Sequence, residues 1–90
     1  ADRTFDDLIA GWREVNKEHP QGRAVLPFLP ALVTRTDGFY RSANCSSQQK
    51  RELMALTGDA VQGMDTRSVL TTKVRALWRG IESSLAATSR

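Results

Sequence analysis

The stretch that decides the fold is residues 70–85, LTTKVRALWRGIESSL. Its large apolar residues recur at intervals of 4, 3, 4 and 4 positions, which is the period of one buried face of an α-helix. The members of this stripe are Leu70, Val74, Leu77, Ile81 and Leu85. We expect a helix that Asp65 or Thr66 caps and that frays over residues 86–90. Such an amphipathic helix requires other segments to share its core.

A first segment with the same period starts at Thr4. Its apolar positions share one face of a helix and are Phe5, Leu8, Ile9, Trp12 and Val15. Thr4 is the predicted N-cap. Pro20 ends the helix, because the residue before a proline is displaced from the α region.

The second segment has a helical stripe although it contains Pro27 and Pro30. A helix that begins at Pro27 accommodates both prolines, since the first four amides of a helix have no internal acceptor. Residues 23–26 are then extended. The predicted stripe is Val25, Phe28, Leu29, Leu32, Thr36 and Phe39.

A third helix is predicted to open at Ser46, because Ser46 and Gln49 have the spacing of a capping box. Its apolar face comprises Leu53, Leu56, Thr57, Ala60 and Met64. Gly63 is the predicted terminator, since glycine readily takes the left-handed conformation that ends many helices.

These four segments fill most of the 90 residues. The composition, 40% hydrophobic and 26% charged, is that of an ordinary packed domain. No segment alternates apolar and polar residues over the length of a strand. Short connections make consecutive helices double back, so we predict an all-α fold, a small four-helix up-and-down bundle. Residues 1–90 are expected to form a single helical domain, whether as a whole protein or as a fragment of a larger one.

The side chains of most enzyme and metal sites are scarce in this sequence. His19 and Cys45 are its one histidine and one cysteine, and neither lies in a motif with metal-ligand spacing. The six glycines are scattered and form no phosphate-binding loop. We therefore predict a protein that is not an enzyme, with no catalytic, cofactor-binding or metal-binding residues and no cofactor.

Cysteine usage and hydropathy bear on where the protein is located. A single cysteine cannot form an internal disulfide, which favours a reducing compartment and hence the cytoplasm. No apolar run approaches the roughly 18 residues of a membrane span, so we expect no membrane partner.

Two apolar rows lie beside the main stripes of the second and third helices. They are Leu26, Val33 and Tyr40 in the second and Met54 and Val61 in the third. A widened apolar face can form a groove for a partner helix or for a second copy of the chain. The leading hypothesis is therefore a non-catalytic protein-interaction module of docking or adaptor type that binds through these residues. The competing interpretation is that they are the flanks of an ordinary core.

The alternative hypothesis is a nucleic-acid-binding accessory domain. It uses a basic helix face made by Arg67, Lys73, Arg75 and Arg79, which Arg35, Arg41, Lys50 and Arg51 would extend. The formal charge of +3 is compatible with an acidic partner of either kind. A solvated helix surface explains the same residues without any ligand.

Overall fold

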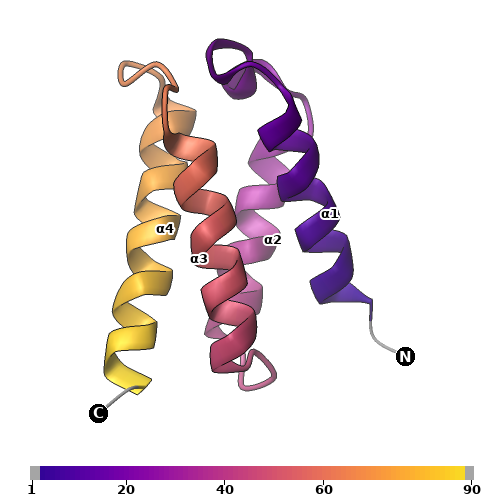
Figure 1. The fold of residues 1–90 in the computed structure, drawn as a ribbon, viewed down its shortest axis with the longest axis vertical. Helices are drawn as coiled ribbons and strands as arrows, with labels where there is room; N and C mark the ends of the chain where they lie inside the picture. Colours follow the sequence, from indigo (N-terminus) through magenta and orange to yellow (C-terminus); the bar gives the residue numbers. More distant parts are fainter. Residues whose placement is uncertain (1–2, 89–90) are drawn as a thin grey trace.

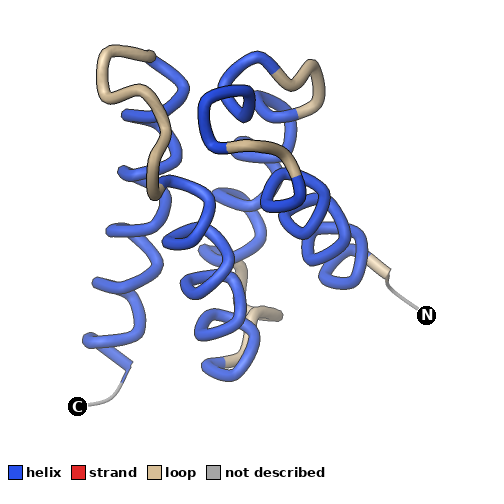
Figure 2. The backbone as a smooth tube through the Cα atoms, turned by 45° about the horizontal axis from the view of Figure 1, so that its top comes forward, coloured by secondary structure: helices blue, strands red, loops and turns tan. Residues whose placement is uncertain are grey.

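The computed structural model describes residues 3–88, and in this range it contains helices and no strand. The elements are α1 (Thr4–Lys17), the 3-10 helix η1 (Pro20–Val25), α2 (Leu29–Arg41), α3 (Ser47–Val61) and α4 (Val69–Thr88). In Figure 1, α1 and α3 run in one direction and α2 and α4 in the opposite direction. Figure 2 shows that short loops join them. The predicted all-α fold, a four-helix up-and-down bundle, is confirmed.

The order of helices around the bundle is not the order along the chain. Helix α3 packs against α1 and, most extensively, against α4, while α2 also packs against α1 and α4. Within the described residues, direct contact between α2 and α3 is no more than marginal. The helices α2 and α3 therefore occupy opposite corners. Two helices that run in the same direction, α2 and α4, become neighbours.

The core is built mostly from the predicted helix faces, and Tyr40 of the predicted partner-binding row and the loop residue Cys45 are buried with them. Its buried apolar residues are Leu8, Ile9, Trp12, Val15, Leu29, Leu32, Tyr40, Cys45, Leu53, Ala60, Met64, Val74, Leu77, Ile81 and Leu85. At its centre the buried indole Nε1 of Trp12 donates a hydrogen bond to Thr36 Oγ1 at 3.0 Å. The hydroxyl of Thr36 donates in turn to the carbonyl of Leu32 at 2.7 Å. This chain satisfies the polar atoms that α1 and α2 bury against each other.

Arg23 in η1 is buried, with 8% of its surface exposed, and has no carboxylate partner among the described residues. Its guanidinium donates instead to four backbone carbonyls. Nε bonds Glu18 O at 3.0 Å, Nη1 bonds Asp59 O and Ala60 O at 2.9 Å each, and Nη2 bonds Asn16 O at 3.3 Å. These acceptors lie at the carboxyl ends of α1 and α3, where unpaired carbonyls carry partial negative charge. Arg23 thus joins two helix ends.

The segment before α2 differs from the sequence prediction. Residues 20–25 form η1 instead of extended chain, and Leu26 is extended, so α2 starts at Leu29 and not at Pro27. Pro30 then occupies the second helical position, where its missing amide costs no hydrogen bond. The displaced start leaves Val25 80% and Phe28 41% exposed, so their placement in the buried stripe was wrong.

Helix ends follow the sequence signals to different degrees. The capping box of Ser46 and Gln49 is confirmed, with bonds of 3.1 and 3.0 Å between each side chain and the other residue's amide. Gly63 has φ +77° and follows α3 as its predicted terminator. Thr4 lies inside α1, and the N-cap position is Arg3.

Helix α4 also differs from the prediction at both of its ends. Asp65 caps a turn, in which its carboxylate accepts from the Arg67 amide at 2.9 Å, and α4 itself begins at Val69. The helix extends to Thr88, beyond residue 86 where fraying was predicted to begin, and Leu85 near its end is buried. Residues 89 and 90 lie outside the described residues. None of the described helices has the length and apolar character needed to cross a membrane.

Candidate functional site

The parallel helices α2 and α4 form a groove whose register is set by one close contact. A Cβ added at Gly80 would overlap the hydroxyl of Tyr40, so the glycine lets the tyrosine ring pack against the α4 backbone. Further up the groove, Val33 lies beside Lys73 and Leu77. Both contacts pair residues about 40 positions apart. The two helices therefore keep one alignment along the groove.

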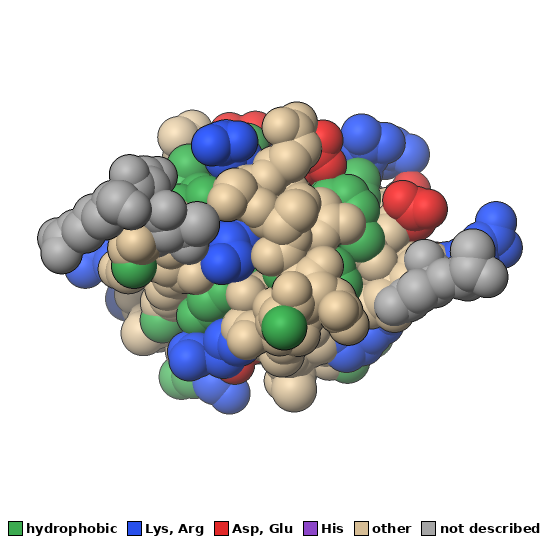
Figure 3. Space-filling view, turned by 90° about the horizontal axis from the view of Figure 1, so that it is seen from below, with side chains coloured by type: hydrophobic (Ala, Val, Ile, Leu, Met, Phe, Trp, Pro, Cys, Tyr) green, Lys and Arg blue, Asp and Glu red, His purple; other side chains and the backbone are tan. Residues whose placement is uncertain are grey.

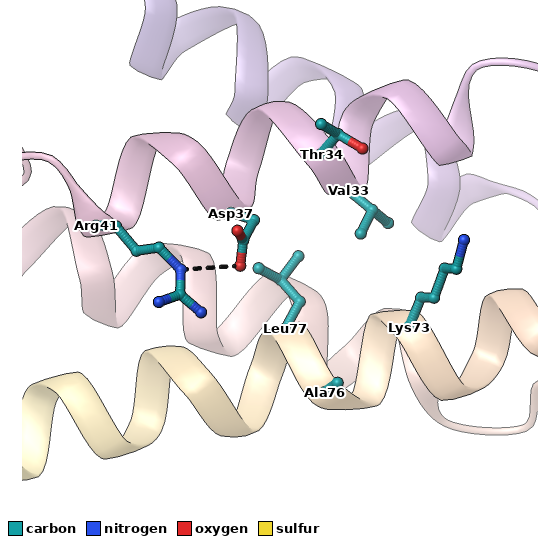
Figure 4. Close-up of a pocket in the computed structure, with 7 residues that line it drawn as sticks. All are labelled: Val33, Thr34, Asp37, Arg41, Lys73, Ala76 and Leu77. Carbon is teal, nitrogen blue, oxygen red and sulfur yellow. Dashed lines mark hydrogen bonds and ion pairs between the residues drawn. The ribbon is translucent and has the colours of Figure 1, made fainter.

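The middle of the groove is an open hollow of about 370 Å³. Figure 4 shows the side chains that line it, with those of α2 on one wall and those of α4 on the other. They are Val33, Thr34, Asp37, Arg41, Lys73, Ala76 and Leu77. The apolar residues Val33, Ala76 and Leu77 form what we call its floor, with Lys73 toward one end of the hollow and the Asp37–Arg41 pair toward the other.

The hollow contains two positively charged side chains and one negatively charged side chain. Asp37 Oδ1 accepts a hydrogen bond from Arg41 Nε at 3.2 Å, an exposed ion pair one helical turn apart. This bond raises the pKa of Arg41, and the charges of the Tyr40 hydroxyl group and of Asp37 act in the same direction. The Arg41 guanidinium also lies 5.1 Å from the centroid of the Tyr40 ring. Lys73 on the opposite wall makes no ion pair with a described residue. The hollow therefore presents one free cation beside a neutralised pair.

The lower end of the groove is a second hollow of about 590 Å³, formed by α2, α3 and α4. Its lining residues are Tyr40, Arg41, Ser42, Lys50, Gly80, Ser83 and Ser84. Lys50 Nζ of α3 donates to Ser84 Oγ of α4 at 2.9 Å. Two cations and three serine hydroxyls line this end, and its lining includes no acidic side chain.

The residues of the predicted apolar rows lie in separate parts of the structure. Val33 and Tyr40 line the α2–α4 groove, and Tyr40 is itself buried. Leu26 precedes α2 and is half-buried against the core. Met54 and Val61 are also half-buried, on the face of α3 whose Gly58 packs against Trp78 of α4. Since α2 and α3 lie on opposite corners, the two rows do not form one continuous surface.

The four residues of the predicted basic face are divided by the fold. Arg67 forms an exposed ion pair with Asp65 at 3.1 Å. The hydrogen bonds from Arg67 lower the pKa of the Asp65 carboxyl. Lys73 lines the α2–α4 groove. Helical spacing directs Arg75 and Arg79 away from the α2–α4 groove, and Arg79 is exposed. They do not share one face with Lys73.

The remaining candidate side chains take structural roles. His19 is exposed in the turn before η1, where its Nδ1 accepts from the Gln21 amide at 3.2 Å. Cys45 is buried, and this burial raises the pKa of its thiol, with nearby Lys50 acting in the opposite direction. Over residues 3–88 no three His, Cys, Asp or Glu side chains gather in a group that would hold a metal ion.

Sequence reasoning found some residues of the groove and missed the way they combine. Val33, Tyr40 and Lys73 were assigned to two different hypothetical surfaces, and the structure brings them to one. Arg41 and Lys50 were expected only as extensions of a basic row. Ala76, Ser83 and Ser84 carry no sequence signal of their own.

Comparison of the chain with protein-family models, with curated proteins and with solved structures finds no match.

Proposed function

We propose that this domain is a protein-interaction module whose α2–α4 groove binds an acidic amphipathic helix of a partner protein. The observation that supports it is the combination, in one groove, of an apolar floor with cations along its edges. An amphipathic helix presents the complementary pattern, with one apolar face and flanking charges.

The length of the groove suits a short helix. Helix α2 has 13 residues, and a helix of that length extends about 20 Å at 1.5 Å per residue. A partner helix of three to four turns would place two or three apolar side chains over Val33, Ala76 and Leu77. At the upper end, the 71% exposed Val69 continues the apolar surface of α4. In the alignment of α4 with α2, Val69 lies opposite the first turn of α2.

The charges favour an acidic partner over a basic one. Lys73, Arg41 and Lys50 follow the groove from its middle to its lower end, and the one carboxylate in the lining, Asp37, is already paired with Arg41. Complementary charges accelerate encounter and fix orientation more than they add affinity. Binding should therefore weaken as salt is raised.

The same observations favour protein over nucleic acid. A phosphate backbone is bound by cations that follow its track, and here Lys73 lines the groove whereas Arg75 and Arg79 are directed away from it. The apolar floor has no counterpart in duplex recognition through the backbone. Nucleic-acid binding stays a prediction, and titration with DNA and RNA at two salt concentrations tests it.

The proposal is tested with a model peptide helix that carries Leu on one face and Glu on its flanks. A second peptide with Lys in place of Glu keeps the apolar pattern and reverses the charge. We expect the 15N-labelled domain to bind the acidic peptide saturably, with amide shifts concentrated on α2 and α4. Equal affinity for both peptides, or shifts centred on α1 and α3, would contradict the proposal.

Matched variants separate docking from general charge effects. Ala76→Glu places a carboxylate on the groove floor, whereas Ala55→Glu places one at an exposed site on α3. Both keep the helix, because Ala and Glu have similar helix propensities. Ala76→Glu should weaken acidic-peptide binding by about tenfold or more, which corresponds to about 1.4 kcal/mol. An equal loss in Ala55→Glu would show that net charge alone controls binding.

A further inference from the structure

At the lower end of the groove, three helices bring hydrogen-bond donors to one place. Arg41 and Ser42 come from the end of α2, Lys50 from the first turn of α3, and Ser83 and Ser84 from α4. Figure 3 views this end of the bundle and shows Lys and Arg side chains scattered over it among apolar, acidic and other groups. The residues span more than 40 positions in the sequence, so only the tertiary fold assembles them.

Several of these side chains have N–H or O–H groups that make no hydrogen bond to a described residue. Arg41 uses Nε for Asp37, and no partner occupies its two terminal nitrogens among the described residues. Lys50 has three N–H groups and donates one to Ser84. Ser83 is exposed and its hydroxyl has no partner in the described part of the chain. A group with several acceptor oxygens could bind all three residues together.

The side-chain charges of the lining also favour an anion. The lining contains two cations and no carboxylate, and of these cations Arg41 is paired with Asp37 outside the lining while Lys50 makes no ion pair with a described residue. Lys50 lies in the first turn of α3, near the positive end of its dipole. On the α2 side the Phe39 carbonyl, which would repel an anion, already accepts bonds from the amide and the hydroxyl of Ser42 at 3.0 and 2.8 Å.

From this geometry we propose that the hollow binds a phosphate monoester carried by a side chain of the docked partner helix. A dianionic phosphate offers three acceptor oxygens and roughly twice the charge of a carboxylate, which matches donors that converge from different helices. The assignment of the phosphate to a protein partner rests on the proposed docking function. The anion site itself does not depend on the proposed docking function.

The anion site is tested first with inorganic phosphate at constant ionic strength. Amide shifts of the 15N-labelled domain should saturate and should centre on residues 40–42 and 80–84. Arg41→Gln and Lys50→Gln should each weaken phosphate binding about tenfold, the loss expected for one charge-assisted hydrogen bond. Arg13→Gln removes an equal charge from an exposed position of α1, outside the groove and this hollow, so it should leave phosphate affinity nearly unchanged.

Circular dichroism first establishes that the three variants remain folded. Equal weakening in all three variants, or unsaturable shifts spread over the molecule, would overturn the anion site. If Arg41→Gln is unfolded, Arg41→Lys is tested in its place, and if Lys50→Gln is unfolded, Lys50→Arg is tested in its place. These substitutions keep the charge, and each should retain most of the affinity.

The source of the phosphate is tested with the acidic model peptide, with and without one phosphoserine at its end nearest the hollow. We expect phosphorylation to tighten binding about tenfold in the wild type and hardly at all in Lys50→Gln. If inorganic phosphate binds but phosphorylation has no effect on peptide affinity, the partner assignment is overturned and the anion site stands. If neither peptide binds while phosphate does, the docking function fails by itself.

Discussion

Replacing Arg23 by Met removes a guanidinium that joins the carboxyl ends of α1 and α3 while keeping an unbranched apolar stem. Four carbonyls lose their donor. The bond to Ala60 O is buried and the other three are partly buried, so water can replace some of the lost bonds. A hydrogen bond from a charged group contributes about 1.5–3 kcal/mol when it is protected from water, and less when it is hydrated. We expect Arg23→Met to reduce the free energy of unfolding by about 3–4 kcal/mol.

This loss is large for a domain of 90 residues, whose total stability is about 5–13 kcal/mol. It corresponds to a fall in Tm of about 15–25 °C. Urea unfolding followed by tryptophan fluorescence measures it directly, and Arg35→Met, at an exposed position of α2, is the matched control. Arg23→Lys should lie between wild type and Arg23→Met, since one ammonium group reaches fewer carbonyls. A loss below about 1 kcal/mol, or one equal to that of Arg35→Met, would refute the bridging role.

Three further changes test other parts of the fold. Thr36→Val removes the acceptor of the Trp12 indole and should cost about 1–2 kcal/mol in urea unfolding; no cost would mean that the indole is solvated. Gly63→Ala forces a Cβ onto φ +77° and should destabilise by about 1–2 kcal/mol, whereas Gly38→Ala, with open space in α2, should stabilise by about 0.5–1 kcal/mol; the same sign in both would contradict the backbone assignment. Because burial raises the pKa of the Cys45 thiol, its contribution to stability is complete below the unfolded thiol pKa of about 8.5 and is lost as the pH rises above it. The urea midpoint should fall in alkali in the wild type, and a Cys45→Ala variant should lack this fall.

The sequence predicts the parts of this fold that depend on local periodicity and capping. The stripe from Leu70 to Leu85 packs into the core, and Ser46 caps α3 as its spacing with Gln49 indicates. The prediction failed where tertiary contacts decide. Nothing in the PQGRAV segment indicates that Arg23 will be buried or that a 3-10 helix will form around it.

The candidate site was only partly predictable for a related reason. Periodicity shows which face of a helix is buried, but it does not show which helix that face meets. Val33 and Tyr40 were placed on an apolar row and Lys73 on a basic one, and both assignments agree with their chemistry. Their meeting depends on α2 being next to α4 instead of α3, and short loops gave the opposite expectation.

The parallel alignment of α2 and α4 has a consequence for how the groove comes into existence. The chain must travel the length of the bundle through α3 before the second wall can be added (Figure 1). During synthesis, α2 is therefore made well before its counterpart, and the proposed docking surface is complete only when α4 folds. A chain truncated before residue 73 would keep every α2 residue but would lose the second wall of the proposed surface, together with the core residues Val74, Leu77, Ile81 and Leu85. Deletion mapping would then attribute the proposed binding to α4 alone. A partner that needs both walls would bind completed chains and not nascent ones.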